Sequence, residues 1–447
     1  MRKFYLFLLV MLGFVACTSD GLRENAVQES KSLTQQYDPN RRSFAEVVEI
    51  AQNSIKMLDE DKAMTRAIAP IRKLNLKDGV KAFRKAGTRS GEANSDNDTL
   101  FYVFNFEDNQ GFSIVSASRH AEGLIAVVEE GSYDPAVPTG NPGFDTYMNM
   151  AKAYVAYKDM EGSEKETLIT KAITRQNPMY NHVYDTVFYK KVSPRITVRW
   201  GEDYRMGQYC SNGLCGPSCT AAAQIMSYYQ YPYARSLTYS GADVTNTAFA
   251  WSYMCNSNHL YADHTYNVDD YDKQIGRLAR QLGQEAGSSY DTNPNKTVTT
   301  ESDMRSTMIS WGYNAGSIAD YSYSNVDNTY VIGTLLGAGK LVYMYGTNSA
   351  GKRHVWVVDG CKYVKAYERI MISYDGINWS VFQEVATHRT YHNHINWGMK
   401  GAGNGYFYSN ILNANNAIQY DSNLTYPLQS GQDYNYYNSV QYFPVWH

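Results

Sequence analysis

The stretch 210–232, CSNGLCGPSCTAAAQIMSYYQYP, constrains the fold most, because it places three cysteines at the start of an alanine-rich helical pattern. Gly216 permits a close approach of the backbone, and Pro217 is tolerated in a helix only in its first turn. Pro232 follows the end of the pattern. A helix N-terminus stabilises a nearby thiolate and lowers its pKa. The stretch therefore predicts a helix that begins beside a reactive cysteine.

The composition is that of a globular chain with room for more than one domain. The chain has 447 residues, of which 43% are hydrophobic and 19% are charged, enough for two or three domains with sizeable cores. The formal net charge is only −3, which argues against a nucleic-acid partner because such proteins usually carry a basic face. In the second half of the chain, helical patterns come first and strand patterns follow. This order predicts an α+β fold.

The N-terminus is typical of an export signal. Arg2 and Lys3 precede an uncharged run from Phe4 to Ala16, which fits the apolar part of a signal peptide and is too short to span a membrane. Small residues before Cys17 resemble a bacterial lipoprotein signal, in which that cysteine becomes the lipidated first residue; ordinary cleavage nearby is the alternative. No other segment approaches about eighteen consecutive apolar residues. We therefore expect an exported protein, held at the outer membrane or cell surface through Cys17, or secreted after processing.

Export gives the remaining cysteines a particular meaning. In an oxidising compartment, an odd number of cysteines leaves at least one thiol free to react. Three of them lie in the stretch that opens the alanine-rich helix. Besides Cys17 the chain has Cys210, Cys215, Cys219, Cys255 and Cys361.

A thiol nucleophile also needs a base and a group that orients the base. His354 opens the apolar strand pattern HVWVVDG, where a histidine can be held rigid and half dry. Asn396, in HINWGMKG, can accept a hydrogen bond from the imidazole, and Trp397 can shield that bond from water. Taken alone, His354 would more often be a structural histidine, and Asn396 part of an ordinary turn. The chain order Cys, His, Asn is that of papain-like enzymes.

Two other kinds of site fit the sequence less well. A transglutaminase-like acyltransferase needs an aspartate after the histidine, and Asp359 is only five residues beyond His354. A metal site would have to use His388, His392 and His394, but these lie on no HExxH-type helix and have no cysteine at zinc spacing. We expect neither a metal nor another cofactor.

Three blocks of the sequence resemble the signatures of the streptopain family of bacterial cysteine peptidases. They are GQYCSNGLCGPSCTAAAQIMSYYQYP, RHVWVVDG and INWGMKG, at residues 207–232, 353–360 and 395–401. The segments at 100–134, 249–254 and 434–443 are similar to the family's pro-segment, its aromatic segment and its closing strand. The resemblance therefore begins near residue 40 and covers most of the chain.

The resemblance implies a latent peptidase with a papain-like catalytic domain behind a small α+β pro-domain. It assigns the nucleophile to Cys215, the general base to His354, the orienting residue to Asn396, the tryptophan that follows it to Trp397, and an oxyanion donor to Gln208. It implies a signal peptide at 1–17, a pro-segment at 18–185 and a peptidase domain at 186–447. Proteins or peptides would be the substrates, and the pro-segment would be an intramolecular inhibitor. Its removal would require cleavage between Glu164 and Pro194.

The sequence also departs from the family pattern. Gln224 lies nine residues after Cys215 and five after Cys219, whereas the family usually has about seven, so Cys219 stays an alternative nucleophile. We prefer Cys215 because Gln208 and the CGP junction fit it better. Met399 replaces a family tryptophan, and Arg353 replaces a small residue. These departures favour the main alternative function, an inactive peptidase-like surface lipoprotein that binds a host or glycan partner.

Overall fold

The computed structural model describes thirteen ranges of the chain; the expected signal peptide and Cys17 lie outside them. The fold below is that of Arg42–His447, which forms one compact unit, whereas Met1–Arg41 forms another. Among the described helices, none is long and apolar enough to cross a membrane. The described residues are 40–62, 72–74, 80–83, 99–172, 179–256, 270–291, 296–321, 328–373, 378, 380–413, 419–420, 423 and 436–447.

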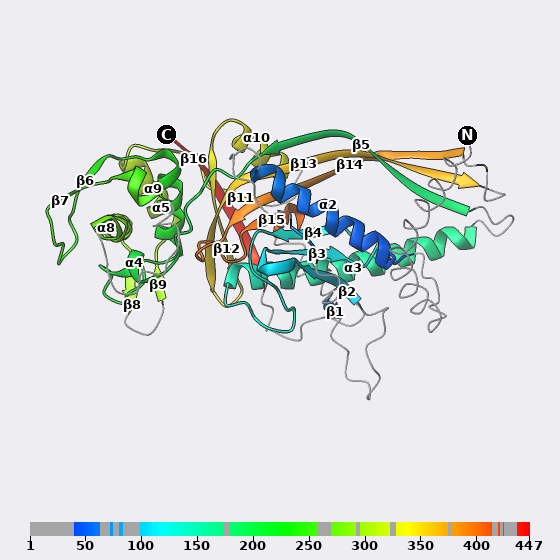
Figure 1. Ribbon diagram of the computed structural model, residues 1–447, viewed down its shortest axis with the longest axis horizontal. Coiled ribbons are helices and arrows are strands. Elements are labelled where there is room, and N and C mark those ends of the chain that lie inside the picture. The colour runs from blue at the N-terminus through cyan, green and yellow to red at the C-terminus, as the bar shows by residue number, and fades with distance from the viewer. Residues whose placement is uncertain are drawn as a thin grey trace, which may run out of the picture. The chain divides into compact units, whose positions relative to one another are not determined.

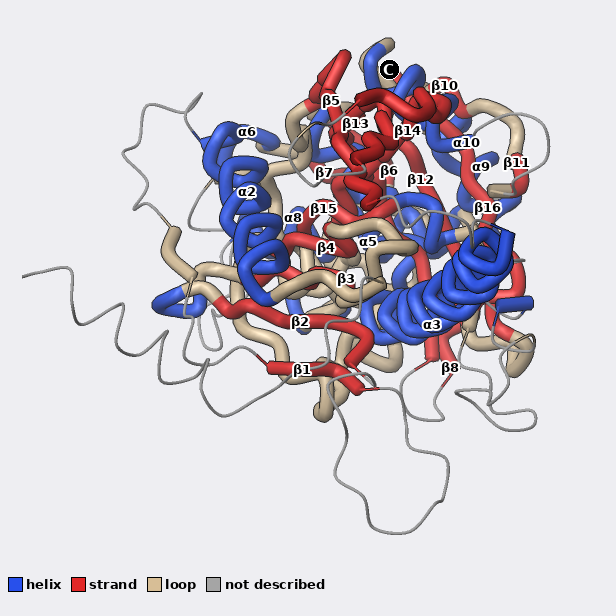
Figure 2. Tube along the Cα trace, turned by 90° about the vertical axis from the view of Figure 1, so that its right-hand side faces the viewer, coloured by secondary structure: helices blue, strands red, loops and turns tan. Residues whose placement is uncertain are grey.

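The N-terminal part contains two helices on opposite faces of antiparallel strands (Figure 2). The first helix begins with a capping box, in which the Ser43 amide donates to the Glu46 carboxylate at 2.7 Å and the Glu46 amide donates to the Ser43 hydroxyl at 3.3 Å. Along β3 the side chains alternate, so that Ile114 packs with α3 and Val115 with α2. The elements are α2 (Phe44–Lys62), β1 (Val80–Phe83), β2 (Thr99–Asn105), β3 (Phe112–Ser116), β4 (Leu124–Val128) and α3 (Pro142–Ala172).

A helical part follows, with α5 (Pro217–Tyr229) at its centre. This helix confirms the helix predicted after the cysteine-rich start, whereas the reactivity of a cysteine there stays a prediction. It packs against α8 and α9 in a buried cluster that also includes Val355 and Val357 of a later strand. The other elements of this part are α4 (Tyr204–Gly207), α6 (Trp251–Met254), α8 (Asp270–Glu285), α9 (Glu301–Ser310) and the hairpins β6–β7 (Ala234–Ser236, Asn246–Ala248) and β8–β9 (Ser289–Asp291, Lys296–Val298).

The last part supplies the long strands of one large antiparallel sheet (Figure 1). The main path of the sheet is β1-β2-β3-β4-β15-β14-β13-β12-β16-β10. Strands of the N-terminal part therefore continue into strands of the C-terminal part, through the pairing of β4 with β15. The elements are β10 (Asn314–Ala315), β11 (Ala319–Asp320), α10 (Asn328–Gly337), β12 (Leu341–Asn348), β13 (Arg353–Ser373), β14 (Ser380–Asn396), β15 (Gly405–Tyr408) and β16 (Tyr437–Trp446).

Most of the chain between His354 and Trp397 forms a long β-ladder. β13 and β14 pair almost from end to end, and β5 (Met179–Val192) pairs along the other edge of β13. The three strands run side by side in Figure 1. The expected domain boundary at 185/186 falls inside β5, so the structure groups residues 179–192 with the strands of the C-terminal part.

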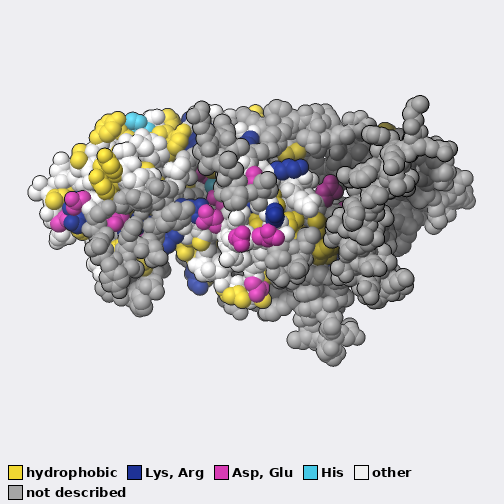
Figure 3. Space-filling model, viewed as in Figure 1, with side chains coloured by type: hydrophobic (Ala, Val, Ile, Leu, Met, Phe, Trp, Pro, Cys, Tyr) yellow, Lys and Arg dark blue, Asp and Glu magenta, His cyan; other side chains and the backbone are white. Residues whose placement is uncertain are grey.

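The sheet separates two hydrophobic cores. Because side chains alternate along a strand, Trp356 and Val358 of β13 pack on the α3 side, whereas Val355 and Val357 pack on the α5 side. The α3-side core contains residues from both halves of the chain. Segregated helices on an antiparallel sheet confirm the predicted α+β class. On the face shown in Figure 3, acidic and basic side chains are intermixed, in keeping with the small net charge.

Candidate active site

The start of α5 is shaped by its glycine and proline. Gly216 adopts a φ of 87° at the N-cap, and Pro217 occupies the first helical position. A Cβ on Gly216 would lie 2.9 Å from Cγ2 of Thr297, so a larger residue would meet both backbone strain and a neighbouring side chain. Glycine at position 216 therefore lets the backbone enter the helix in this conformation. This conformation places Cys215 directly before the helix.

Cys215 is a free, fully buried thiol beside the helix start. Its Sγ lies 3.3 Å from Oγ1 of Thr220 and 3.6 Å from the carbonyl oxygen of Gly216, and its exposed fraction is 0%. None of the five cysteines that the structure describes forms a disulfide. Burial raises the pKa of the Cys215 thiol well above its usual value, and the neighbouring Cys219 and Glu202 raise it further. In this form the thiol is neutral, despite the helix N-terminus.

The alternative nucleophile, Cys219, faces another part of the molecule. Successive residues on a helix are turned by about 100°, and the face of α5 that carries Thr220 lies against Gly398 of the loop after β14. Cys219 instead lies 3.9 Å from Oγ of Ser288, and burial raises its pKa to about 12. Of the two thiols, Cys215 is therefore the one linked through Thr220 to the Asn396–Gly398 loop.

His354 is held by the residue after the expected orienting asparagine. Its Nε2 lies 3.0 Å from the carbonyl oxygen of Trp397, which can only accept, so Nε2 carries the proton and Nδ1 keeps its lone pair. The ring stacks beside Trp356 and lies 6.2 Å, centre to centre, from the Trp397 ring. Burial lowers the pKa of His354 to about 4, although the hydrogen bond to Trp397 opposes this shift. The imidazole is therefore neutral at neutral pH.

The pairing of Cys215 with His354 stays a prediction. The His354 ring lies on the Trp356 side of β13, toward α3, whereas Cys215 packs in the core on the other face of the sheet. Among the described residues, no hydrogen bond joins the two side chains. In this structure both groups are neutral, because burial raises the pKa of the Cys215 thiol and lowers the pKa of His354.

Asn396 and Trp397 have structural contacts that the sequence does not reveal. Oδ1 of Asn396 accepts from Nε2 of Gln224 at 3.1 Å and from the Gly398 amide at 3.2 Å. The same Gln224 amide donates to the carbonyl oxygen of Trp200. Trp397 is fully buried. In this form Asn396 ties α5 to the loop after β14, and its role as the group that orients His354 stays a prediction.

Gln208 lies away from the thiol. Its Nε2 donates to the carbonyl oxygens of Arg205 and Asp272, each at 2.8 Å. These bonds use both N–H groups of the amide and join α4 to α8. The oxyanion role that the sequence suggests for Gln208 therefore stays a prediction, and in this form the amide is occupied elsewhere.

Gly143, in the N-terminal part, covers His354. A Cβ on Gly143 would lie 2.4 Å from Cδ2 of His354 and 2.5 Å from Cε3 of Trp397. Asn141 caps α3 by accepting from the Phe144 amide, and its own amide donates to the Ala402 carbonyl at 3.0 Å. The start of α3 is thus fixed against the histidine. The Pro-Gly pair at 142–143 signals a helix start, but nothing in it signals this contact.

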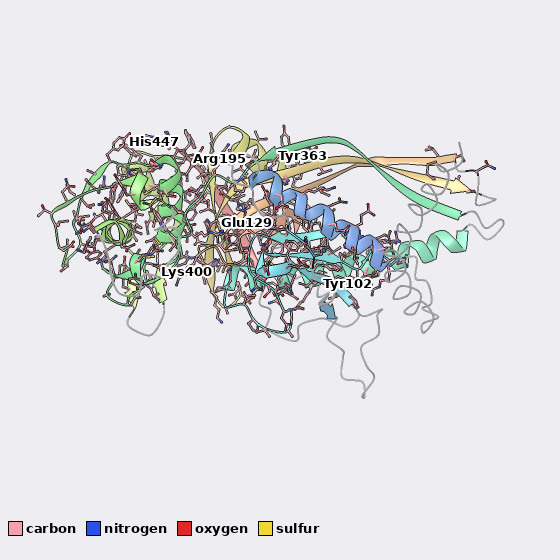
Figure 4. The ribbon with its side chains drawn as sticks, viewed as in Figure 1. Tyr102, Glu129, Arg195, Tyr363, Lys400 and His447 are labelled. Carbon is pink, nitrogen blue, oxygen red and sulfur yellow. The ribbon has the colours of Figure 1, made fainter. Side chains whose placement is uncertain are left out.

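Two of the three histidines weighed as metal ligands have other partners, and the side chain of the third, His388, lies outside what the structure describes. Nδ1 of His394 lies 2.6 Å from a carboxylate oxygen of Asp359, and Nε2 lies 3.2 Å from one of Glu129, which Figure 4 labels. His392 donates through Nε2 to the carbonyl oxygen of Leu124 at 2.8 Å. Among the described residues, no group of three His, Cys, Asp or Glu side chains could hold a metal. His392 and His394 therefore bind the N-terminal part, at β4 and just beyond it.

Comparison with known proteins decides the family. The model of the peptidase C10 family matches residues 175–407, which is more than half of the chain. The chain belongs to the peptidase C10 family. The matched range contains Cys215, His354 and Asn396. A second model, described as Spi protease inhibitor, matches residues 55–155 of this C10 chain. These matches confirm the resemblance to streptopain-like peptidases and identify the N-terminal part as inhibitor-like.

Relatives of this C10 peptidase chain are distant. Streptopain from Streptococcus pyogenes is 24% identical over 368 residues, which cover 74% of this chain and 81% of that protein. The structure of a prointerpain A fragment from Prevotella intermedia is 17% identical, covers 83% of this chain and 98% of its own, and has a TM-score of 0.46. Active interpain A from the same organism covers 57% of this chain and 94% of its own, with a TM-score of 0.36.

Proposed function

We propose that this chain is the latent precursor of an exported cysteine endopeptidase whose nucleophile is Cys215 and whose general base is His354. The observation that carries the proposal is the contact of Gly143 with the His354 ring. An inhibitor-like segment that covers a histidine, beside a family-specific helix start with a free thiol, has the layout of a zymogen. We further propose that lipidated Cys17 anchors the precursor to a membrane.

Latency follows from the positions and charges of the two groups. With α3 in place, His354 is turned toward Trp397 and is too weak a base to hold a proton at neutral pH, because burial lowers its pKa to about 4. Burial likewise keeps Cys215 protonated. Loss of the α3 contact would admit water to the imidazole, raise its basicity and free it to approach the thiol.

In the mature form, Cys215 would attack a peptide carbonyl as a thiolate, paired with protonated His354. The S–C bond forms and the carbonyl electron pair moves to oxygen. His354 then gives its proton to the leaving amine as the C–N bond breaks. It later takes a proton from the water that hydrolyses the acyl-enzyme.

The maturation cut belongs between the end of α3 at Ala172 and the start of β5 at Met179. A cut within β5 would divide a strand that pairs with β13. A cut between the two elements would leave β5 in the peptidase. This proposal narrows the range expected from the sequence to residues 173–178.

Casein cleavage by matched full-length variants tests the proposed function. We expect Cys215→Ala and His354→Ala to fold but neither self-process nor cleave casein after processing in trans by wild-type enzyme. Cys219→Ala, the matched control on the same helix, should retain both activities. Normal activity of Cys215→Ala with loss in Cys219→Ala would reverse the assignment of the nucleophile. Absence of activity in processed wild-type protein would favour the inactive surface lipoprotein.

A further inference from the structure

Glu301, the first residue of α9, binds three neighbouring elements through one buried carboxylate. The helix α9 packs beside α5 (Figure 1). Oε1 of Glu301 accepts from the Ser218 hydroxyl of α5 at 3.3 Å and lies 3.2 Å from Nε of Arg353 of β13. Oε2 accepts from the Tyr343 hydroxyl of β12. The carboxylate therefore joins the first turn of α5 to the start of β13.

Arg353 is the other half of this link, and it stands directly before His354. Because side chains alternate along a strand, Arg353 lies on the α5 side of the sheet, whereas the His354 ring lies beside Trp356. The guanidinium also binds the backbone, because Nη2 donates to the carbonyl oxygen of Thr299. A buried carboxylate without its cation is strongly destabilising. Arg353, one of the departures from the family pattern, thus has a matching acid in Glu301.

The segment that leads into α9 also holds the loop before the proposed nucleophile. Oγ1 of Thr297 donates to the carbonyl oxygen of Leu214 at 2.8 Å and accepts from the Asn212 amide at 3.0 Å. Asn212 in turn accepts from the Leu214 backbone amide at 3.0 Å. The Thr297 side chain also fills the space beside Gly216. The backbone on both sides of Cys215 is therefore fixed by contacts to this segment.

The whole network belongs to the peptidase part of the chain. Its residues span 212–353, inside the range that the peptidase C10 model matches. Removal of the N-terminal part would therefore leave these contacts in place. The backbone at the start of β13 is set against the start of α5 already in the precursor.

We propose that Glu301 and Arg353 are positioning residues of the peptidase, which hold the start of β13 against the start of α5 so that His354 can pair with Cys215. This role rests on the proposed peptidase function. The two residues act through the backbone, since Arg353 precedes the base and Glu301 bonds the helix that follows the nucleophile. With the strand already in place, formation of the pair requires movement of the His354 side chain and no rearrangement of β13.

A double variant tests this role without leaving a buried charge unpaired. Mature enzyme would be prepared from the full chain as wild type and as Arg353→Met/Glu301→Gln, which removes both charges and nearly keeps the side-chain volumes. The matched control, Arg235→Met/Glu285→Gln, removes another ion pair of the helical part, in which Arg235 Nε donates to Glu285 at 3.1 Å. This pair joins β6 to α8 and does not include the start of α5 or of β13.

The expected result is a loss of kcat without a loss of substrate binding. Because a misplacement of about 1 Å can cost about 100-fold in rate, we expect kcat of Arg353→Met/Glu301→Gln to fall about 10- to 100-fold, with KM nearly unchanged. The control should keep the wild-type kcat. Arg353→Lys retains the charge but not the forked contact, so its kcat should lie between those of wild type and the double variant.

The alkylation rate of mature Cys215 by iodoacetamide gives a second readout, which should fall with kcat. If the double variant does not fold, Ser218→Ala breaks only the α5 end of the link and should lower kcat, whereas Ser227→Ala, a buried serine farther along α5, should not.

An unchanged kcat in the folded double variant, an equal fall in the control, or a rise in KM alone would overturn the positioning role and leave the peptidase function intact. Mature wild type that does not cleave casein would instead refute the peptidase function.

Discussion

Substitution of Gly143 tests how the N-terminal part maintains the latent state. Substituting alanine would place a methyl carbon 2.4 Å from the His354 ring and 2.5 Å from the Trp397 ring. Such overpacking usually destabilises the packed state by about 1–3 kcal/mol. Alanine also favours the helix, by up to about 1 kcal/mol, which opposes the effect. A net weakening of the α3 contact by about 2 kcal/mol would increase the open fraction of the precursor about 30-fold.

The assay is the rate of self-processing of the full-length precursor, together with site-resolved alkylation of Cys215. Both rates should rise about 30-fold in Gly143→Ala if opening precedes reaction. Ser132→Thr adds one methyl group at an exposed position of the same segment and should leave both rates unchanged. If Gly143→Ala processes and alkylates at the wild-type rate, the start of α3 does not control His354.

Three further predictions concern other parts of the account. Burial lowers the pKa of His394, but Asp359 and Glu129 outweigh it and raise this pKa to about 10. Folding therefore favours the protonated imidazole. The resulting stabilisation of the precursor should be complete below about pH 6.5 and should be lost as the pH rises from 6.5 to 10. His394→Gln should flatten that pH dependence of the free energy of unfolding, and an unchanged curve would exclude the ion pairs as its source. Gln224→Ala removes the buried amide that donates to both Trp200 and Asn396, leaving Asn396 only its bond from the Gly398 amide. It should lower the free energy of unfolding by about 2 kcal/mol in urea titrations, whereas a loss below about 0.5 kcal/mol would contradict the network. Cys17→Ser should move the precursor from the membrane fraction to the soluble fraction, and unchanged membrane association would exclude this anchor.

The parts of the fold with local sequence signals could be predicted. The helix at α2 has a capping box made by Ser43 and Glu46, and α5 has a glycine–proline start, so both begin where the sequence indicates. The turn between β2 and β3 is marked by Asn109 and Gly111, which adopt positive φ. Each of these signals lies within a few residues of the structure that it specifies, and this is why it can be read without tertiary information.

The contacts that define the latent state are long-range and carry no such signal. Gly143 packs against His354, although more than 200 residues separate them in the sequence. His394 contacts Glu129, which follows β4, near the pairing of β4 with β15. The sequence groups His392 and His394 but does not reveal that each also contacts the inhibitor-like part, at Leu124 and Glu129. The expected domain boundary at 185/186 lies inside β5, whose pairing with β13 is long-range and has no local sequence signal.

The central claim is that the N-terminal part keeps Cys215 and His354 apart and uncharged. The most direct measurement is site-resolved alkylation of the cysteines before and after cleavage at 173–178, in wild type and in His354→Ala. We predict that Cys215 becomes rapidly labelled only after cleavage and only when His354 is present, while Cys219 stays slow. Equal labelling of Cys215 in precursor and product, or fast labelling that survives the loss of His354, would contradict the account.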